Sequence, residues 1–198
     1  MLKYYFRLLL LVGASIGIFA VIGSLIPRSY DFSTQMEMSA PPEAIFPKIN
    51  SLREWQDWSM QFNPALIDDL EIEYNGEQAG KGAAQSWMDI RGKGKLWITQ
   101  SEPNSRIEYE TKFANFPKMS SQIELQAAEG KTLVKWKSQG KLPGGPFYGY
   151  FGSFFSTQME NEYNKSLQKL KSVVESARNN IVDGEDSAPR EVEDKQDG

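Results

Sequence analysis

Two serine and lysine pairs in this sequence have the spacing of a catalytic motif. Ser138 precedes Lys141 and Ser166 precedes Lys169, each with two residues between them, which is the S-x-x-K spacing of some serine enzymes. The S-D-N and K-T-G motifs that accompany it in those enzymes do not occur in the chain. The first pair falls in an expected turn and the second on the surface pattern of an expected helix. We therefore interpret both as chance matches.

Other candidate motifs also lack the context that their chemistry needs. Gly80-Lys81-Gly82 and Gly92-Lys93-Gly94 neither open a helix nor belong to a βαβ unit, as phosphate-binding loops do. The acidic pair Asp68-Asp69 offers fewer oxygen ligands than calcium requires. The chain has no histidine and no cysteine, which supply most ligands for zinc, copper, haem and iron–sulfur centres. We expect no catalytic residue, no metal and no cofactor.

Charge argues against a nucleic-acid partner. The formal net charge is −4, and residues 182–198 hold seven acidic residues against two basic ones. The remainder of the chain is close to neutral and has no basic field of the kind that nucleic-acid binding needs.

The end of the chain, residues 180–198, lacks aromatic residues and periodicity, so we expect a disordered acidic tail.

Aromatic side chains are the most distinctive candidates for a binding site, because ligand pockets are lined mainly by apolar and aromatic groups. An alternative is that these residues fill a solid core. The candidate ligand-binding residues are Trp58, Trp87, Trp97, Tyr109, Phe113, Trp136, Phe147, Phe151, Phe155 and Met159.

The first element of the chain is a hydrophobic segment. Residues 8–26 contain no charge and have about the ~20 residues that a helix needs to cross a bilayer. A cleaved signal peptide is the alternative, but no A-x-A-like cleavage site follows. Lys3 and Arg7 precede the segment and Arg28 follows it, so the positive-inside tendency places residues 1–7 in the cytoplasm. The domain is then extracytoplasmic, and periplasmic in a Gram-negative cell.

Two glycines in the hydrophobic segment raise the question of a dimer. Gly13 and Gly17 form a G-x-x-x-G pair, which lets two membrane helices approach closely. The alternative is that small residues are simply common in such helices. A weak homodimer through this pair is a hypothesis.

The rest of the chain, residues 30–178, has the pattern of one domain. Residues 30–38 alternate as a first strand, and Pro41-Pro42 and the apolar residues after them predict two short helices that end near Trp58. Short alternating runs at 70–76, 82–90, 94–100, 105–113, 118–128 and 131–140 predict an antiparallel meander. Apolar steps of three and four from Phe147 to about Ala177 predict one long helix.

Alternation along the strands predicts which side chains face the long helix. Trp136 shares its face with Thr132 and Val134, whereas Lys135 and Lys137 point away from it. The same rule places Tyr109 and Phe113 together on one face. The neighbours of Trp87 and Trp97 are too mixed to assign a face.

The stretches APPEAIF, WQDWS, GKGAAQSW and GKTLVKW, with the long closing helix, resemble the START-like (SRPBCC) superfamily in its polyketide cyclase/dehydrase and lipid-transport branch. The resemblance covers residues 31–177. It implies an α+β helix-grip fold, with a curved antiparallel sheet of about seven strands, two short helices, one long C-terminal helix and an apolar cavity. Relatives often continue the second tryptophan as W-S-P-W, and this chain departs from that pattern after Trp58 and Ser59.

The function that these features predict is a membrane-tethered domain that binds a hydrophobic small molecule or lipid between the sheet and the long helix. One alternative is an enzyme of the same fold that uses acids such as Asp57, Asp89 or Glu108. Another is an interaction module of an envelope complex with a filled interior. Four glycines near the start of the long helix, at 144, 145, 149 and 152, suggest a loosely held gate over the cavity.

Overall fold

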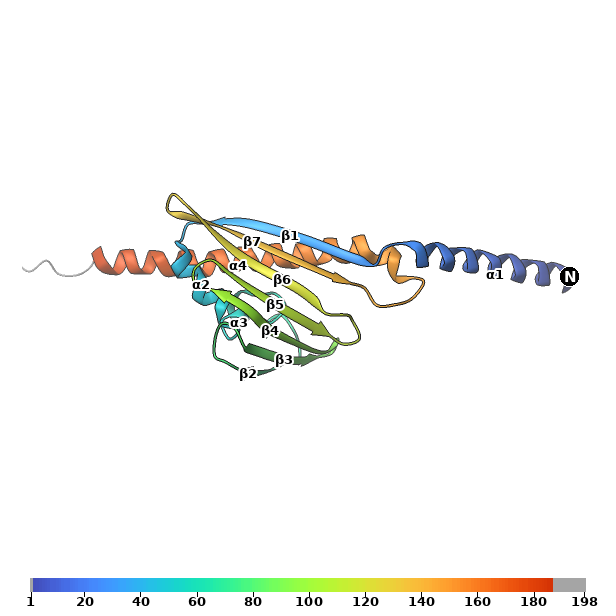
Figure 1. Ribbon diagram of the computed structural model, residues 1–198, viewed down its shortest axis with the longest axis horizontal. Helices are drawn as coiled ribbons and strands as arrows, with labels where there is room; N and C mark the ends of the chain where they lie inside the picture. Colours follow the sequence, from blue (N-terminus) through green and yellow to red (C-terminus); the bar gives the residue numbers. More distant parts are fainter. Residues whose placement is uncertain (1, 187–198) are drawn as a thin grey trace, which may run out of the picture.

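The computed structural model describes the backbone of residues 2–186 and the side chains of residues 2–152 and 154–177. A hydrophobic helix precedes a seven-stranded antiparallel sheet, two short helices and a long last helix (Figure 1). In chain order the elements are α1 (Leu2–Leu25), β1 (Ser29–Met38), α2 (Pro42–Asn50), α3 (Trp55–Trp58), β2 (Glu71–Gly76), β3 (Ala83–Asp89), β4 (Gly92–Glu102), β5 (Arg106–Phe113), β6 (Met119–Ala128), β7 (Lys131–Lys141), the 3-10 helix η1 (Tyr148–Phe151) and α4 (Gly152–Asp186).

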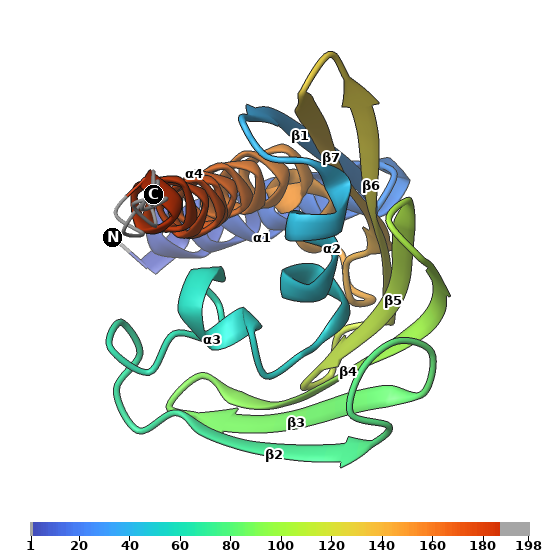
Figure 2. The same ribbon diagram turned by 90° about the vertical axis from the view of Figure 1, so that its left-hand side faces the viewer.

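The sheet is a meander closed by its first strand, in the order β1-β7-β6-β5-β4-β3-β2. Every neighbouring pair is antiparallel. The sheet curves around α2, α3 and α4, which lie on its concave side (Figure 2). This is the α+β helix-grip arrangement that the sequence predicts.

Two indole groups fix the short helices. The last carbonyls of a helix have no partner within the helix, so buried ones need donors from elsewhere. Trp55 Nε1 donates to the carbonyl of Ile49 at 2.9 Å, and Trp58 Nε1 donates to that of Lys48 at 3.0 Å. Both tryptophans are buried, and their rings lie 5.0 Å apart. The W-x-x-W spacing therefore joins α3 to the end of α2.

The long helix packs through one apolar stripe. Tyr163, Leu167, Leu170 and Val174 are buried at steps of three and four residues. Tyr163 stacks on Trp136 of β7 with 3.8 Å between ring centroids, so Trp136 does face the helix. The helix starts later than expected, because residues 148–151 form η1, and it continues beyond Ala177 to Asp186. The remaining part of the expected tail, residues 187–198, lies outside the described residues.

The hydrophobic helix α1 contacts the domain near its C-terminal end. Phe19 stacks on Tyr150 with 4.2 Å between centroids, and Tyr150 Oη donates to the Phe19 carbonyl at 2.7 Å. A Cβ on Gly23 would lie 1.8 Å from the Pro146 carbonyl oxygen, and one on Gly149 would lie 2.7 Å from Ile26 Cβ. These two glycines therefore allow the backbones of α1 and η1 to touch.

Candidate ligand-binding site

An apolar pocket of about 270 Å³ opens between the sheet and the start of α4. The sheet contributes from β1, β3, β5 and β6, and three connections contribute, which follow α3, β3 and β5. Its lining residues are Tyr30, Gln61, Phe62, Trp87, Arg91, Thr111, Phe113, Phe116, Pro117, Met119, Phe155, Met159 and Glu162.

Strand register places this pocket at the end of the sheet next to α1. Ser29 follows α1 and pairs with Lys141, Ser120 pairs with Gln139, and Thr111 pairs with Met119. Gly94 pairs with both Phe113 and Trp87. Because antiparallel neighbours keep this register across the sheet, residues far apart in the chain meet at the same end.

Aromatic rings form the walls of the pocket. Trp87 and Phe113 stack at 6.2 Å, and Phe62 meets Trp87 edge-on at 5.0 Å. Tyr30 lies 4.7 Å from Phe155 on the other side. Gly94 makes room for the indole, since a Cβ there would lie 2.1 Å from Trp87 Cζ2. The stretch Gly92-Lys93-Gly94 therefore has a structural role.

The structure brings together four of the ten predicted site residues, namely Trp87, Phe113, Phe155 and Met159. Three others belong to the packed core: Trp58, Tyr109 and Trp136 are at most 2% exposed and do not line the pocket. Trp97 lies on the outer face of β4, where its ring is 5.6 Å from Lys118 Nζ.

Phe147 and Phe151 are also outside the pocket, because they belong to the segment that packs along α1, where they are exposed.

Several residues that line the pocket were not predicted from the sequence. Phe62, Phe116 and Pro117 lie in loops, where no periodicity marks an inward face. Tyr30 lies two residues before the buried Phe32 and therefore on the same face of β1. Alternation along this strand was the signal that could have found Tyr30.

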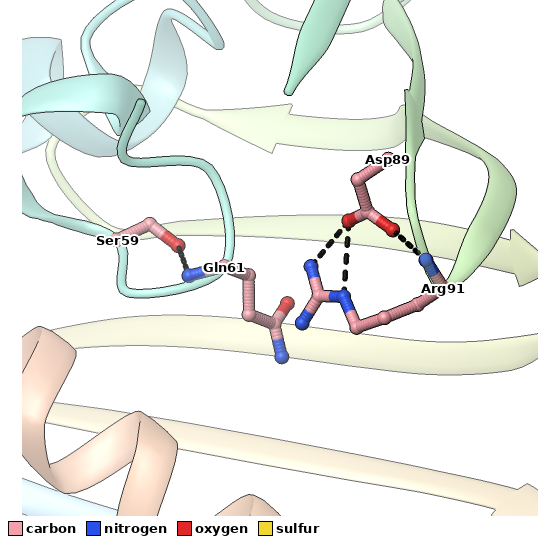
Figure 3. A network of polar contacts seen from close by, with 4 residues as sticks. All are labelled: Ser59, Gln61, Asp89 and Arg91. Carbon is pink, nitrogen blue, oxygen red and sulfur yellow. Dashed lines mark hydrogen bonds and ion pairs between the residues drawn. The ribbon is translucent and has the colours of Figure 1, made fainter. Parts of the chain in front are cut away.

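An ion pair lies at the edge of the pocket (Figure 3). Arg91 Nε donates to Asp89 Oδ2 at 3.0 Å, and the Arg91 backbone N–H donates to Oδ1 at 2.7 Å. The Asp89 side chain is buried, and the hydrogen bond from Arg91 lowers its pKa. The side chain of Gln61 points toward the Arg91 guanidinium (Figure 3). Because Asp89 is held ionised by this pair, the Arg91 guanidinium in the pocket lining has a carboxylate partner.

A hydroxyl group in the pocket has no protein partner. Thr111 Oγ1 is buried and makes no hydrogen bond within the described residues. Buried polar groups are nearly always paired, so an unpaired one on a residue that lines the pocket is an exception. The pocket lining is therefore mainly apolar, and its polar side chains are Tyr30, Gln61, Arg91, Thr111 and Glu162.

The acids named as catalytic candidates are not in this pocket. Asp57 is exposed on α3, and Glu108 is on the outer face of β5, opposite the buried Tyr109. Asp89 is engaged by Arg91. Among residues 2–186, no three His, Cys, Asp or Glu side chains gather as a metal site would need.

Beside the pocket, buried hydroxyl groups form a connected network. Trp136 Nε1 donates to Tyr109 Oη at 2.9 Å, and Tyr109 Oη is 3.4 Å from Tyr163 Oη. Tyr163 Oη lies 3.1 Å from Ser138 Oγ, which is 2.6 Å from Ser121 Oγ. Ser138 of the first S-x-x-K pair is therefore a structural residue in the core.

Burial of the phenols predicts a loss of stability at alkaline pH. Burial, and then the neighbouring Tyr163, raises the pKa of Tyr30 to about 12, and burial also raises those of Tyr109 and Tyr163. Above pH 10 the unfolded chain releases protons that the folded domain still holds, so the free energy of unfolding falls as the pH rises from 10 to 12. Denaturant titrations across this range should show the fall. It should be smaller in Tyr30→Phe, and an equal fall in that variant would contradict the assignment.

The comparisons with known proteins agree with the fold. TTHA0849 from Thermus thermophilus superposes with a TM-score of 0.57 at 14% identity, over 74% of this chain and 98% of that chain. MLL2253 from Mesorhizobium loti superposes with a TM-score of 0.55 at 12% identity, over 74% of this chain and 97% of that chain. The Aha1 dimer structure from Colwellia psychrerythraea gives 0.52 at 14% identity, over 73% and 95%. At these identities the likeness concerns the fold alone.

Sequence comparison gives the family. None of the curated proteins matches the chain at a significant level. The family model described as polyketide cyclase / dehydrase and lipid transport matches residues 29–175, from the start of β1 to the last turns of α4. This range includes the sheet, the helices on its concave face and every residue that lines the pocket. The chain therefore belongs to the polyketide cyclase / dehydrase and lipid transport family.

Proposed function

We propose that this protein is a membrane-anchored binding domain for a hydrophobic small molecule or a lipid. The observation that carries the proposal is the aromatic pocket at the α1 end of the sheet. Its volume of about 270 Å³ lies near the lower end of the ~300–1,000 Å³ that is usual for ligand sites. It suits one small apolar molecule or part of an acyl chain, with a polar group that can pair with Thr111.

The anchor in this proposal is α1. Within the described residues, α1 is long and apolar enough to span a membrane, a test that a signal sequence also passes. Its fit to the domain supports retention of the helix, because a signal that is cleaved has no reason to match the folded domain. The match consists of the Gly23 contact with Pro146 and the Phe19 contact with Tyr150.

The orientation and the oligomeric state remain part of the proposal. The charges at Lys3 and Arg7 favour a cytoplasmic N-terminus, which places the domain outside the cytoplasm. Gly13 and Gly17 have nothing within 4 Å of an added Cβ, so this face of α1 is open to a second copy.

Two substitutions at Thr111 test the binding site. Thr111→Phe adds a ring on the floor of the pocket, and we expect uptake of a fluorescent fatty acid to fall by about tenfold or more, since the volume for the chain is lost. Thr111→Val keeps the volume and removes only the hydroxyl group, so we expect about a two- to tenfold loss of affinity, as for one hydrogen bond. Fluorescence titration of the full chain in detergent measures both.

Controls separate loss of binding from loss of folding. The thermal midpoint of Thr111→Val should equal or exceed that of the parent protein, because an unpaired buried hydroxyl group is removed. Unchanged fatty-acid uptake by a folded Thr111→Phe protein would exclude this pocket as the binding site.

A further inference from the structure

A long uncharged segment stands out in a domain that is otherwise rich in charge. No Asp, Glu, Lys or Arg occurs between Lys141 and Glu160. Here the term η1 segment is used for residues 142–155. It exposes four large aromatic side chains, with exposed fractions of 45% for Phe147, 38% for Tyr148, 55% for Phe151 and 63% for Phe154. Four exposed aromatic residues so close together mark an interaction surface.

The η1 segment lies alongside the hydrophobic helix (Figure 1). Pro146 touches Gly23, Gly149 touches Ile26, and Tyr150 stacks on Phe19. Arg28 Nη1 also donates to the Pro143 carbonyl at 3.4 Å, and the Leu142 N–H donates to the Arg28 carbonyl at 2.8 Å. These contacts hold the segment beside the last two turns of α1.

The length of α1 determines the depth of this contact. The charged residues Arg7 and Arg28 bound the apolar run 8–26, whose 19 residues span about 28 Å at ~1.5 Å per residue. The hydrocarbon core is about 30 Å thick, so the whole run is needed to cross it. Phe19 then lies about 10 Å inside the outer boundary at Ile26, again at ~1.5 Å per residue. The segment that contacts Phe19 must reach the lipid as well.

We infer that the η1 segment is embedded in the interfacial layer of the leaflet from which α1 emerges, with the pocket opening toward the lipid. Aromatic residues favour this layer, and interfacial segments enter it by about 5–10 Å. Phe155, which lines the pocket, follows directly after the exposed Phe154, and the lining residue Met159 follows Phe155 by one helical turn. Tyr30, whose ring lies 4.7 Å from that of Phe155 in the pocket lining, follows the end of α1 by a few residues.

This inference rests on the membrane anchor of the proposed function, and it adds a route for the ligand. A hydrophobic molecule passes between the leaflet and the pocket without crossing water. It also gives the glycines of the segment a different role from a loose gate. Gly149 is required by the close approach to α1, so the segment is docked on the helix.

The absence of native cysteine allows a direct test with single labels. Phe151→Cys and Phe154→Cys, each labelled with an environment-sensitive fluorophore, are placed in the full chain in phosphatidylcholine vesicles. These vesicles also contain quencher lipids, which carry a nitroxide near the headgroup. Ile16→Cys reports insertion of α1. Ala128→Cys is the control at the far end of the sheet, because the β6–β7 hairpin lies opposite the α1 end (Figure 1).

Each outcome has one meaning. We expect a blue shift and a several-fold loss of fluorescence on quenching at positions 151 and 154, and no change at position 128. If position 16 is in lipid but positions 151 and 154 stay in water, this inference is wrong and the anchor stands. A blue shift at positions 151 and 154 without quenching by the nitroxide lipids would indicate a protein partner or a second copy. That result would also overturn this inference. If position 16 is itself in water, the anchor fails and the inference fails with it.

Discussion

Replacing Trp55 by alanine is expected to lower the free energy of unfolding by about 3–5 kcal/mol, the usual cost of removing a large aromatic side chain from a core. Trp55 is 1% exposed, and its ring lies 5.0 Å from that of Trp58 and 5.2 Å from that of Tyr109. The substitution also leaves the buried Ile49 carbonyl without its donor. Since domains are stable by only ~5–15 kcal/mol, the variant loses a large share of its stability.

Denaturant titration of the full chain, followed by circular dichroism, measures this loss. The matched control is Trp97→Ala, the same substitution on the outer face of the sheet, where Lys118 lies over the ring. We expect the control to cost about 1 kcal/mol, as for a cation–π contact on a surface. Equal losses in the two variants would contradict the assignment of Trp55 to the joint between α2 and α3.

Replacing Gly23 by isoleucine is expected to separate α1 from the η1 segment. An added Cβ at this position meets the Pro146 carbonyl oxygen at 1.8 Å and the Tyr150 ring at 2.5 Å, so the backbones cannot keep their contact. The Phe19–Tyr150 stacking and the hydrogen bond from Tyr150 are then lost as well. Hydrogen exchange in residues 143–151 should become many-fold faster, because local opening no longer has to break these contacts.

Gly17→Ile is the matched control for this experiment. It makes the same change in the same helix, at a position where an added Cβ meets nothing within 4 Å. We expect its exchange to equal that of the parent protein. If Gly23→Ile also left exchange unchanged, the α1–η1 contact would not be the element that orders this segment.

Local patterns explain why most of the fold could be predicted from the sequence. Alternation predicts all seven strands to within a few residues, since along each strand more buried and more exposed side chains alternate. Parity placed Trp136 and Tyr109 on the inner face, as the structure has them. Mixed neighbours left Trp87 and Trp97 unassigned, and the register of β3 with β4 places them on opposite faces.

The site itself was only partly predictable, because it depends on contacts between distant residues. Parity tells which side chains face inward, but not where along a curved sheet the interior stays open. Tyr109 and Trp136 face inward under α4, where Tyr163 fills the space. Phe147 and Phe151 looked like the first turn of the helix, yet the contact of Gly23 with Pro146 turns them along α1. No local pattern in the sequence encodes that contact.

Native mass spectrometry of the full chain, released from membranes of its own host, tests the central claim most directly. We predict a population that carries one apolar molecule of defined mass, absent from the folded Thr111→Phe variant purified in the same way. Lipid extraction of the parent protein then gives the chemical class of that molecule. A ligand-free mass for the parent protein, together with no uptake of added fatty acid, would contradict the account.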